Sequence, residues 1–207
     1  MAYLGEIGIA PALDGSTRVD PFDAYAVALS TPSPSALSDP FTAHVFACAI
    51  AVGAIEAHGS QEAIGAAIGL ARADLSQLIL NWAPGAAALV DLCLQPETLP
   101  LDEEEEQIHE LLDRNRADAT AETRWMTSIV TRRSMAPRHL WQDLGLRNRD
   151  ELSQLMTRRF PSLSARNVSN MKWKKFFYRA LCESEGFTLC AAPTCNQCGD
   201  FDNCFGD

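Results

Sequence analysis

The sequence is short of basic residues. Its 207 residues include 17 Lys and Arg against 27 Asp and Glu, which gives a formal net charge of −10 at pH 7. Such an acidic chain is poorly matched to the phosphates of nucleic acids and to anionic lipid surfaces. We therefore expect neither a nucleic-acid partner nor a membrane partner.

Long apolar runs and catalytic motifs are also missing. The longest uncharged apolar stretch, from Phe41 to Ile55, is shorter than the roughly 20 residues that a membrane-spanning helix needs. The first residues, from Met1 to Glu6, have neither the cationic start nor the apolar core of a signal peptide. No glycine-rich phosphate loop, nucleophile elbow or HExxH pattern occurs. We expect a cytoplasmic protein that is not an enzyme.

The composition and the spacing of apolar residues favour helices. Apolar residues make up 47% of the chain and charged residues 21%, as in ordinary globular proteins. Helix starts are predicted near Asp39-Pro40, Ser60 and Glu103, and no alternating strand pattern occurs. The sequence therefore predicts an all-α helical bundle. We expect a weakly ordered N-terminal segment with a Pro/Ser linker over 1–38, a helical domain over 39–185 and an irregular Cys-rich tail over 186–207.

One pattern occurs twice in the chain. Gly69-Leu70 is followed by Leu75-Ser-Gln-Leu78 and then by Pro84. Gly145-Leu146 is followed by Leu152-Ser-Gln-Leu155 and then by Pro161. Glycine and proline interrupt a helical pattern at matching places in both copies. We interpret the two copies as a duplicated helix-turn-helix unit.

Four of the seven cysteines form the strongest functional signal. Their pattern is Cys190-x4-Cys195-x2-Cys198-x5-Cys204, within a turn-rich segment. Structural zinc sites usually separate two cysteine pairs by about a dozen residues, whereas compact runs resemble the ligation of iron–sulfur clusters. We predict that these four thiolates bind an iron–sulfur-type cluster, with zinc as the alternative and disulfides disfavoured in a reducing compartment. The other three cysteines are expected to be plain buried thiols, with a fifth cluster ligand as the alternative for the last of them: Cys48, Cys93 and Cys182.

The segment before this cysteine pattern is basic. No Asp or Glu occurs between Leu152 and Cys182, and a helix is predicted from about 170 to 185. Lys172, Lys175 and Arg179 share one stripe of that helix, opposite an apolar stripe. The stripe is either a solvated face or a binding site for an anion or a partner.

The same residues resemble a known family. The run from Met171 to Cys182, followed by the four-cysteine pattern, resembles the C-terminal signature of the NifQ family of nitrogen-fixation proteins. The segment His139-Leu-Trp-Gln-Asp-Leu-Gly-Leu146 resembles the block that precedes this signature. The resemblance is close from about Arg133 to Phe205.

This resemblance implies a carrier of molybdenum. NifQ-like proteins are taken to hold a molybdenum–iron–sulfur (Mo-Fe-S) cluster and to donate molybdenum for the iron–molybdenum cofactor of nitrogenase. The implied ligands are Cys190, Cys195, Cys198 and Cys204, and the implied cargo is molybdate or its derivative. The implied partners are the nitrogenase iron protein and the cofactor-assembly scaffold. We hypothesise that Cys204 is the releasable ligand, because three thiolates suffice for three irons of a cubane.

Two other functions fit the cysteine pattern. In the first, zinc staples a structural or interaction module. In the second, one glycine-leucine unit is the helix-turn-helix of a DNA-binding regulator, and the cluster is its redox sensor. The few basic residues between 60 and 82, where only Arg72 occurs, weigh against the regulator, whereas the second unit has more Arg and keeps this alternative open.

Overall fold

The computed structural model describes residues 20–60 and 62–184, and every regular element among them is a helix. The expected all-α class is thereby confirmed for this part of the chain. The Cys-rich tail lies outside the described residues. The elements are α1 (Pro21–Ala28), α2 (Pro34–Ser38), α3 (Pro40–Ser60), α4 (Ile64–Ile68), α5 (Arg72–Trp82), the 3-10 helices η1 (Pro84–Ala88) and η2 (Leu92–Leu94), α6 (Glu103–Asp113), α7 (Ala121–Ser134), α8 (Leu140–Asp143), α9 (Arg149–Arg159), α10 (Pro161–Arg166) and α11 (Trp173–Ser184).

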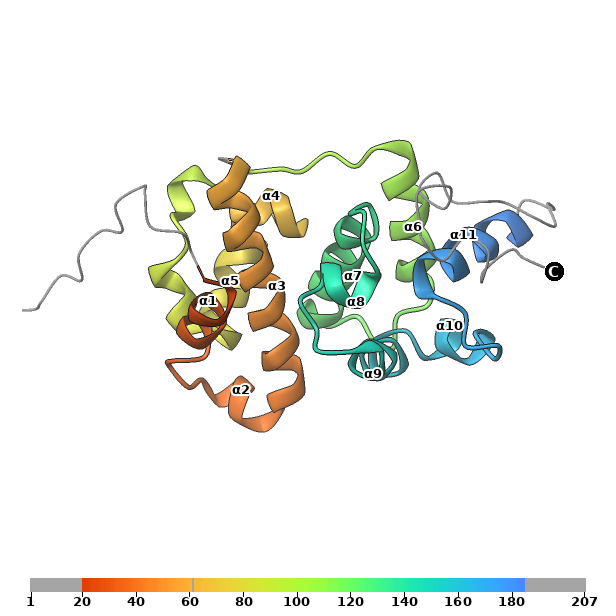
Figure 1. Ribbon diagram of the computed structural model, residues 1–207, viewed down its shortest axis with the longest axis horizontal. Helices are drawn as coiled ribbons and strands as arrows, with labels where there is room; N and C mark the ends of the chain where they lie inside the picture. The colour runs from red at the N-terminus through yellow and green to blue at the C-terminus, as the bar shows by residue number, and fades with distance from the viewer. Residues whose placement is uncertain (1–19, 61, 185–207) are drawn as a thin grey trace, which may run out of the picture.

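The helices gather in two groups. Figure 1 shows α1 to α5 packed in one half of the molecule and α6 to α11 in the other. A segment without regular structure connects the halves before α6. The long helices α3 and α7 each form the centre of one half, because their side chains are buried on most faces. The two halves share one continuous hydrophobic core.

Helix α3 is the core of the first half. Asp39 caps its start, since the Thr42 backbone N–H donates to the Asp39 carboxylate at 3.3 Å. Small side chains let its neighbours approach closely, and Val45 to Ala51 are all buried. By length and composition its residues Pro40–Gly59 could cross a membrane, the one such helix in the described part, although 61% of it is buried inside the fold. This corrects the expectation that the apolar stretch is too short, because the helix extends beyond Ile55.

The N-terminal segment departs from its prediction where it is described. Residues 20–38 were expected to be weakly ordered, yet they form α1 and α2. Ser33 caps α2 through its hydroxyl, and Pro34 occupies the first helical position. Ala24 and Ala28 of α1 are buried against the core. The Pro and Ser residues thus start helices here, because the first half of the fold offers an apolar surface to cover.

The two copies of the glycine-leucine pattern have matching local structures. Gly69 follows α4 with a φ of 77°, and Gly145 follows α8 with a φ of 72°. The left-handed conformation favours glycine at both corners. Each corner precedes an 11-residue helix, α5 or α9, and a proline begins the helix after it. The duplication of this unit stays a prediction.

The two corners pack reciprocally across the halves. A Cβ atom on Gly69 would lie 2.7 Å from the Ser128 carbonyl oxygen of α7. A Cβ atom on Gly145 would lie 3.0 Å from the Cys48 carbonyl oxygen of α3. Each glycine therefore lets its corner touch the backbone of the central helix in the opposite half. Ser128 of α7 and Cys48 of α3 occupy equivalent positions, because each faces the glycine of the other half.

Candidate metal centre

The four predicted metal ligands lie outside the described residues. Ligation by Cys190, Cys195, Cys198 and Cys204 therefore stays a prediction. The structure does describe α11, the helix that precedes them, and the contacts that hold this helix. Among residues 20–60 and 62–184, no group of three His, Cys, Asp or Glu side chains is arranged to hold a metal ion.

The three described cysteines differ in their surroundings. None of them forms a disulfide. Cys48 is buried, as predicted, and burial raises the pKa of its thiol to about 12, with a smaller contribution from the Glu151 carboxylate. Cys93 is exposed, so its prediction as a core residue is wrong. It lies in the short helix η2, which has no buried residue. Cys182 of α11 is half-buried, less than expected for a core thiol.

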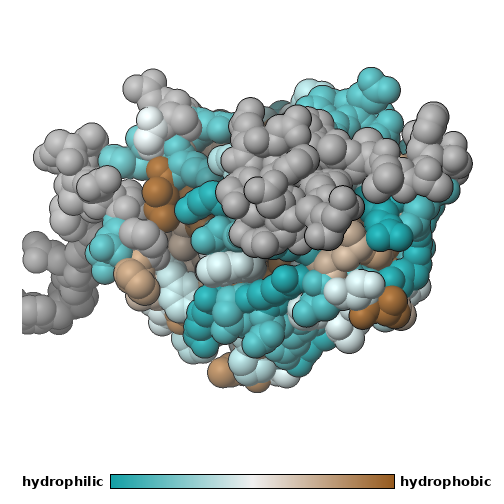
Figure 2. Space-filling view, turned by 45° about the vertical axis from the view of Figure 1, so that its right-hand side comes forward, coloured by the Kyte–Doolittle hydropathy of each residue, from teal (hydrophilic) through white to brown (hydrophobic). Residues whose placement is uncertain are grey.

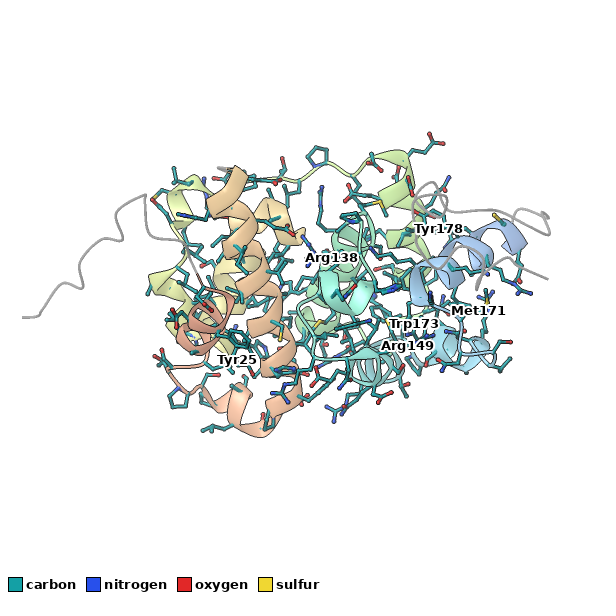
Figure 3. All side chains as sticks on the ribbon, viewed as in Figure 1. Tyr25, Arg138, Arg149, Met171, Trp173 and Tyr178 are labelled. Carbon is teal, nitrogen blue, oxygen red and sulfur yellow. The ribbon has the colours of Figure 1, made fainter. Side chains whose placement is uncertain are left out.

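Helix α11 is attached to the second half by an aromatic face. Trp173 packs edge-on against Phe176, with ring centroids 5.7 Å apart, and lies 6.0 Å from Phe177. All three rings are buried. On the side toward α6, the Tyr178 hydroxyl donates to the Glu104 carboxylate. Figure 3 shows Trp173 and Tyr178 on α11.

A buried ion pair fixes α11 to the corner between α7 and α8. The Lys174 ammonium donates to the Asp143 carboxylate at 2.5 Å and to the Ala136 carbonyl oxygen. Arg138 reaches the other Asp143 oxygen at 3.3 Å. The Asp143 side chain is 1% exposed. Burial lowers the pKa of Lys174; contact with Asp143 opposes this shift, and the charges of Arg133 and Arg138 add to it.

The ion pair belongs to a network that reaches the other half of the molecule. Arg133 of α7 is buried and donates to the Asp143 carbonyl oxygen at 2.8 Å. It also donates to the Ala67 carbonyl oxygen at 2.9 Å and to both Glu56 carboxylate oxygens of α3 at 2.6 and 2.7 Å. Elements α3, α4, α7, α8 and α11 are thereby joined through charged hydrogen bonds. Such bonds are about twice as strong as neutral ones.

Sequence reasoning missed this network, although one signal was present. Asp143 appeared in the sequence only within the block from His139 to Leu146, where no local spacing pairs it with a cation. Lys174 lies three residues before Phe177 and seven before Leu181, on the apolar side of α11. A cation on an apolar stripe requires a buried acceptor. The structure shows that Asp143 is that acceptor.

The predicted basic stripe is not a set of free cations. Arg179 is exposed, but its Nε donates to the Glu183 carboxylate at 2.9 Å, and Arg166 approaches Glu183 at 3.7 Å. Lys172 and Lys175 are half-buried, and neither is without a partner. An anion at this stripe would compete with Glu183 for Arg179. Its role in binding stays a prediction.

The surface around α11 is polar where it can be seen. Figure 2 shows a mostly hydrophilic face on this side of the molecule, with small and separate hydrophobic patches. Hydrophilic side chains therefore make up most of the visible part of this face. The acidic start of α6, with Glu104 beside Tyr178, lies next to the basic residues of α11.

The fold and the site define an all-α protein in which a buried ionic network holds the helix that precedes a four-cysteine segment. The model of the NifQ family matches residues 45–206, a range that includes all four cysteines. The chain therefore belongs to the NifQ family. The resemblance seen in the C-terminal part is confirmed, and the matched range begins well before Arg133.

Relatives in several bacteria agree with this membership. Protein NifQ of Rhodobacter capsulatus is 42% identical over 162 residues, which cover 75% of this chain and 88% of the relative. The NifQ homolog of Sinorhizobium fredii is 35% identical over 173 residues, covering 84% of this chain and 75% of the relative. Protein NifQ of Azotobacter vinelandii is 49% identical over 105 residues, about half of each chain (51% and 53%). No solved structure matches the chain.

Proposed function

We propose that this protein carries molybdenum for nitrogenase cofactor assembly. Cys190, Cys195, Cys198 and Cys204 would bind a molybdenum-containing iron–sulfur cluster, from which molybdenum is donated to the iron–molybdenum cofactor. The observation that carries this proposal is membership of the NifQ family, with a matched range that spans the four cysteines. The donor set fits such a cluster, because thiolates at short spacings are the usual ligands of iron–sulfur centres.

The basic stripe of α11 has a supporting role in this proposal. Molybdate is a tetrahedral oxyanion, and cationic donors bind oxyanions through charge-assisted hydrogen bonds. Lys172, Lys175 and Arg179 would attract the anion or an acidic partner, with Arg179 exchanging its contact to Glu183 for the new one. The proposed partners are the nitrogenase iron protein and the cofactor-assembly scaffold. The proposed location is the cytoplasm, without a nucleic-acid or membrane partner.

Metal analysis of anaerobically purified protein tests the cluster directly. Protein from cells supplied with molybdate should be brown and contain iron, acid-labile sulfide and molybdenum. Cys190→Ala, Cys195→Ala and Cys198→Ala should each lose the chromophore, because each removes a thiolate from iron. Cys93→Ala is the matched control, since Cys93 is exposed and lies far along the chain. A colourless protein with one equivalent of zinc would instead establish the zinc-stapled module.

The delivery role is tested in cells. A deletion strain should fix nitrogen poorly when molybdate is scarce and recover when molybdate is abundant. The reason is mass action, because a carrier raises the supply of a dilute anion without performing an obligatory conversion. Growth on dinitrogen should be compared with the parent strain across a molybdate series. A deletion strain that is equally defective at every molybdate level would contradict delivery.

The structure weighs against the alternative of a DNA-binding regulator. In helix-turn-helix proteins the second helix enters the major groove and supplies the contacting side chains. In the first glycine-leucine unit that helix is α5, whose one basic residue is Arg72, whereas α9 of the second unit contains Arg149, Arg158 and Arg159. The Arg72 guanidinium is already bound to the Gln95 carbonyl oxygen at 2.8 Å and to the Glu97 carboxylate. Helix α5 therefore has no basic side chain left for a phosphate.

A further inference from the structure

A polar cavity lies between α5, α6 and α7, in elements separate from the cysteine segment and from α11. Its volume is about 180 Å3. This is room for roughly six water molecules at about 30 Å3 each, and it is smaller than the roughly 300–1,000 Å3 of sites for drug-sized ligands. The size fits a small metabolite. The lining residues are Asp74, His109, Asp113, Arg116, Arg124, Trp125 and Ser128.

The lining includes two carboxylates and two guanidinium groups. The Asp74 carboxylate accepts the Trp125 indole N–H at 2.9 Å. The Asp113 carboxylate pairs with Arg116 Nε at 3.2 Å, and one Arg124 nitrogen donates to the Ala119 carbonyl oxygen at 2.8 Å. Each carboxylate has about four acceptor sites and each guanidinium five N–H donors. Both kinds of group therefore keep bonding capacity for a ligand.

The reciprocal packing of the glycine corners gives this cavity a counterpart between α1, α3 and α9. Ser128 of α7 is equivalent to Cys48 of α3, so Arg124, one turn earlier, is equivalent to His44. Asp74 is the third residue of α5, and Glu151 is the third residue of α9. At both places, a central helix of one half and an 11-residue helix of the other half thus contribute a basic side chain and a carboxylate to the same site.

The counterpart is filled by the protein itself. Tyr25 of α1 places its hydroxyl 2.8 Å from His44 Nδ1, and His44 Nε2 lies 3.1 Å from the Glu151 carboxylate. At the cavity, α6 lies against α7, whereas at the counterpart α1 lies against α3. Helix α6 contributes His109 and Asp113 to the lining of the cavity, and it has no side chain in the place that Tyr25 of α1 occupies in the counterpart. The Tyr25 side chain thus fills the counterpart, whereas the cavity between α5, α6 and α7 is open.

We propose that the open cavity binds a small zwitterion of the amino-acid type. An anion alone would face two carboxylates, and a cation alone would face two guanidinium groups. A molecule with both charges meets both sets, since its carboxylate can pair with Arg124 and its ammonium with Asp74 or Asp113. The Ser128 hydroxyl and the His109 ring add further hydrogen-bonding partners.

Nuclear magnetic resonance of the full-length protein tests the site through the Trp125 indole N–H. The probes are L-alanine, L-glutamate and L-glutamine, with L-lactate and isopropylamine as analogues of alanine that lack one charge. A Trp125→Phe variant identifies the signal. At least one amino acid should shift the Trp125 indole signal. The shift should saturate by about 20 mM ligand, a concentration well above the Kd of about 1 mM that we expect. Lactate and isopropylamine should bind at least about tenfold more weakly than alanine, the ratio that about 1.4 kcal/mol supplies.

Variants separate the site from general effects on the fold. Asp74→Asn keeps an acceptor for Trp125 but removes the charge, and Arg124→Gln changes an exposed side chain. Each substitution should raise the Kd for the amino acid about tenfold or more. Asp150→Asn, an exposed acid on α9, is the control and should leave binding unchanged. The proposal is overturned if no amino acid gives a saturable shift, or if lactate or isopropylamine binds as tightly as alanine.

Discussion

Removing either member of the Lys174–Asp143 pair should strongly destabilise the protein. Asp143 is 1% and Lys174 15% exposed, so neither charge is well solvated. Asp143→Ala leaves Lys174 buried beside Arg133 and Arg138, and breaking a buried pair in this way costs about 3–5 kcal/mol. Lys174→Met keeps most of the apolar stem and leaves Asp143 its contact with Arg138, so its cost should be smaller, about 2–3 kcal/mol.

The double variant makes the prediction sharper. With both charges gone, Asp143→Ala/Lys174→Met should cost less than the sum of the single changes by at least about 2 kcal/mol. Urea unfolding followed by circular dichroism measures the three free energies of unfolding. The control is Glu110→Ala, which breaks an exposed pair with Arg114 and should cost about 0.5 kcal/mol or less. Additivity of the two single changes within about 0.5 kcal/mol would refute a buried, coupled pair.

The pH dependence of the same variant has a definite sign. The pKa of Lys174 in the folded protein is below its ordinary value of 10.5, mainly because of burial. Between the pKa of Lys174 in the folded protein and 10.5, the unfolded chain binds more protons than the folded one. The free energy of unfolding therefore rises with pH in this window. Relative to Lys174→Met, the parent protein should gain unfolding free energy as the pH approaches 10.5. A difference that does not change with pH in this window would contradict the lowered pKa.

Three further predictions concern other parts of the molecule. The pKa of Cys48 is raised from 9.0 to about 12, so the folded protein keeps a proton that the unfolded chain loses, and stability should fall above pH 9; Cys48→Ala should remove this fall in urea titrations across pH. Gly69→Ala should cost about 2–4 kcal/mol, because it combines a positive φ with contacts under 3.0 Å, whereas Gly59→Ala, with open space around it, should cost nothing. Neutralising the basic stripe should spare helix content but reduce molybdenum loading, mostly at low salt; unchanged loading would identify a solvated face. The stripe residues are Lys172, Lys175 and Arg179.

The sequence by itself determined the helices and where many of them begin. The predicted helix start at Glu103 is confirmed, and Asp102 caps α6 with a reciprocal contact from Glu105. Gly69 interrupts the second helical segment as its pattern predicted, and α11 begins within a few residues of its expected start. These features depend on residues within one or two turns of each other, so local spacing is enough to predict them. The four-cysteine pattern is likewise a local signal.

Only the tertiary structure decided which residues meet. The Pro/Ser segment became α1 and α2 because the first half of the fold presents a surface for Ala24 and Ala28. Cys93 has apolar neighbours in sequence but lies at the surface, where Leu94 is also exposed. Asp143 and Lys174 are 31 positions apart, and nothing in local spacing pairs them. Ion pairs and cavities form where distant elements come together, so their partners are set by packing, which a periodic pattern does not encode.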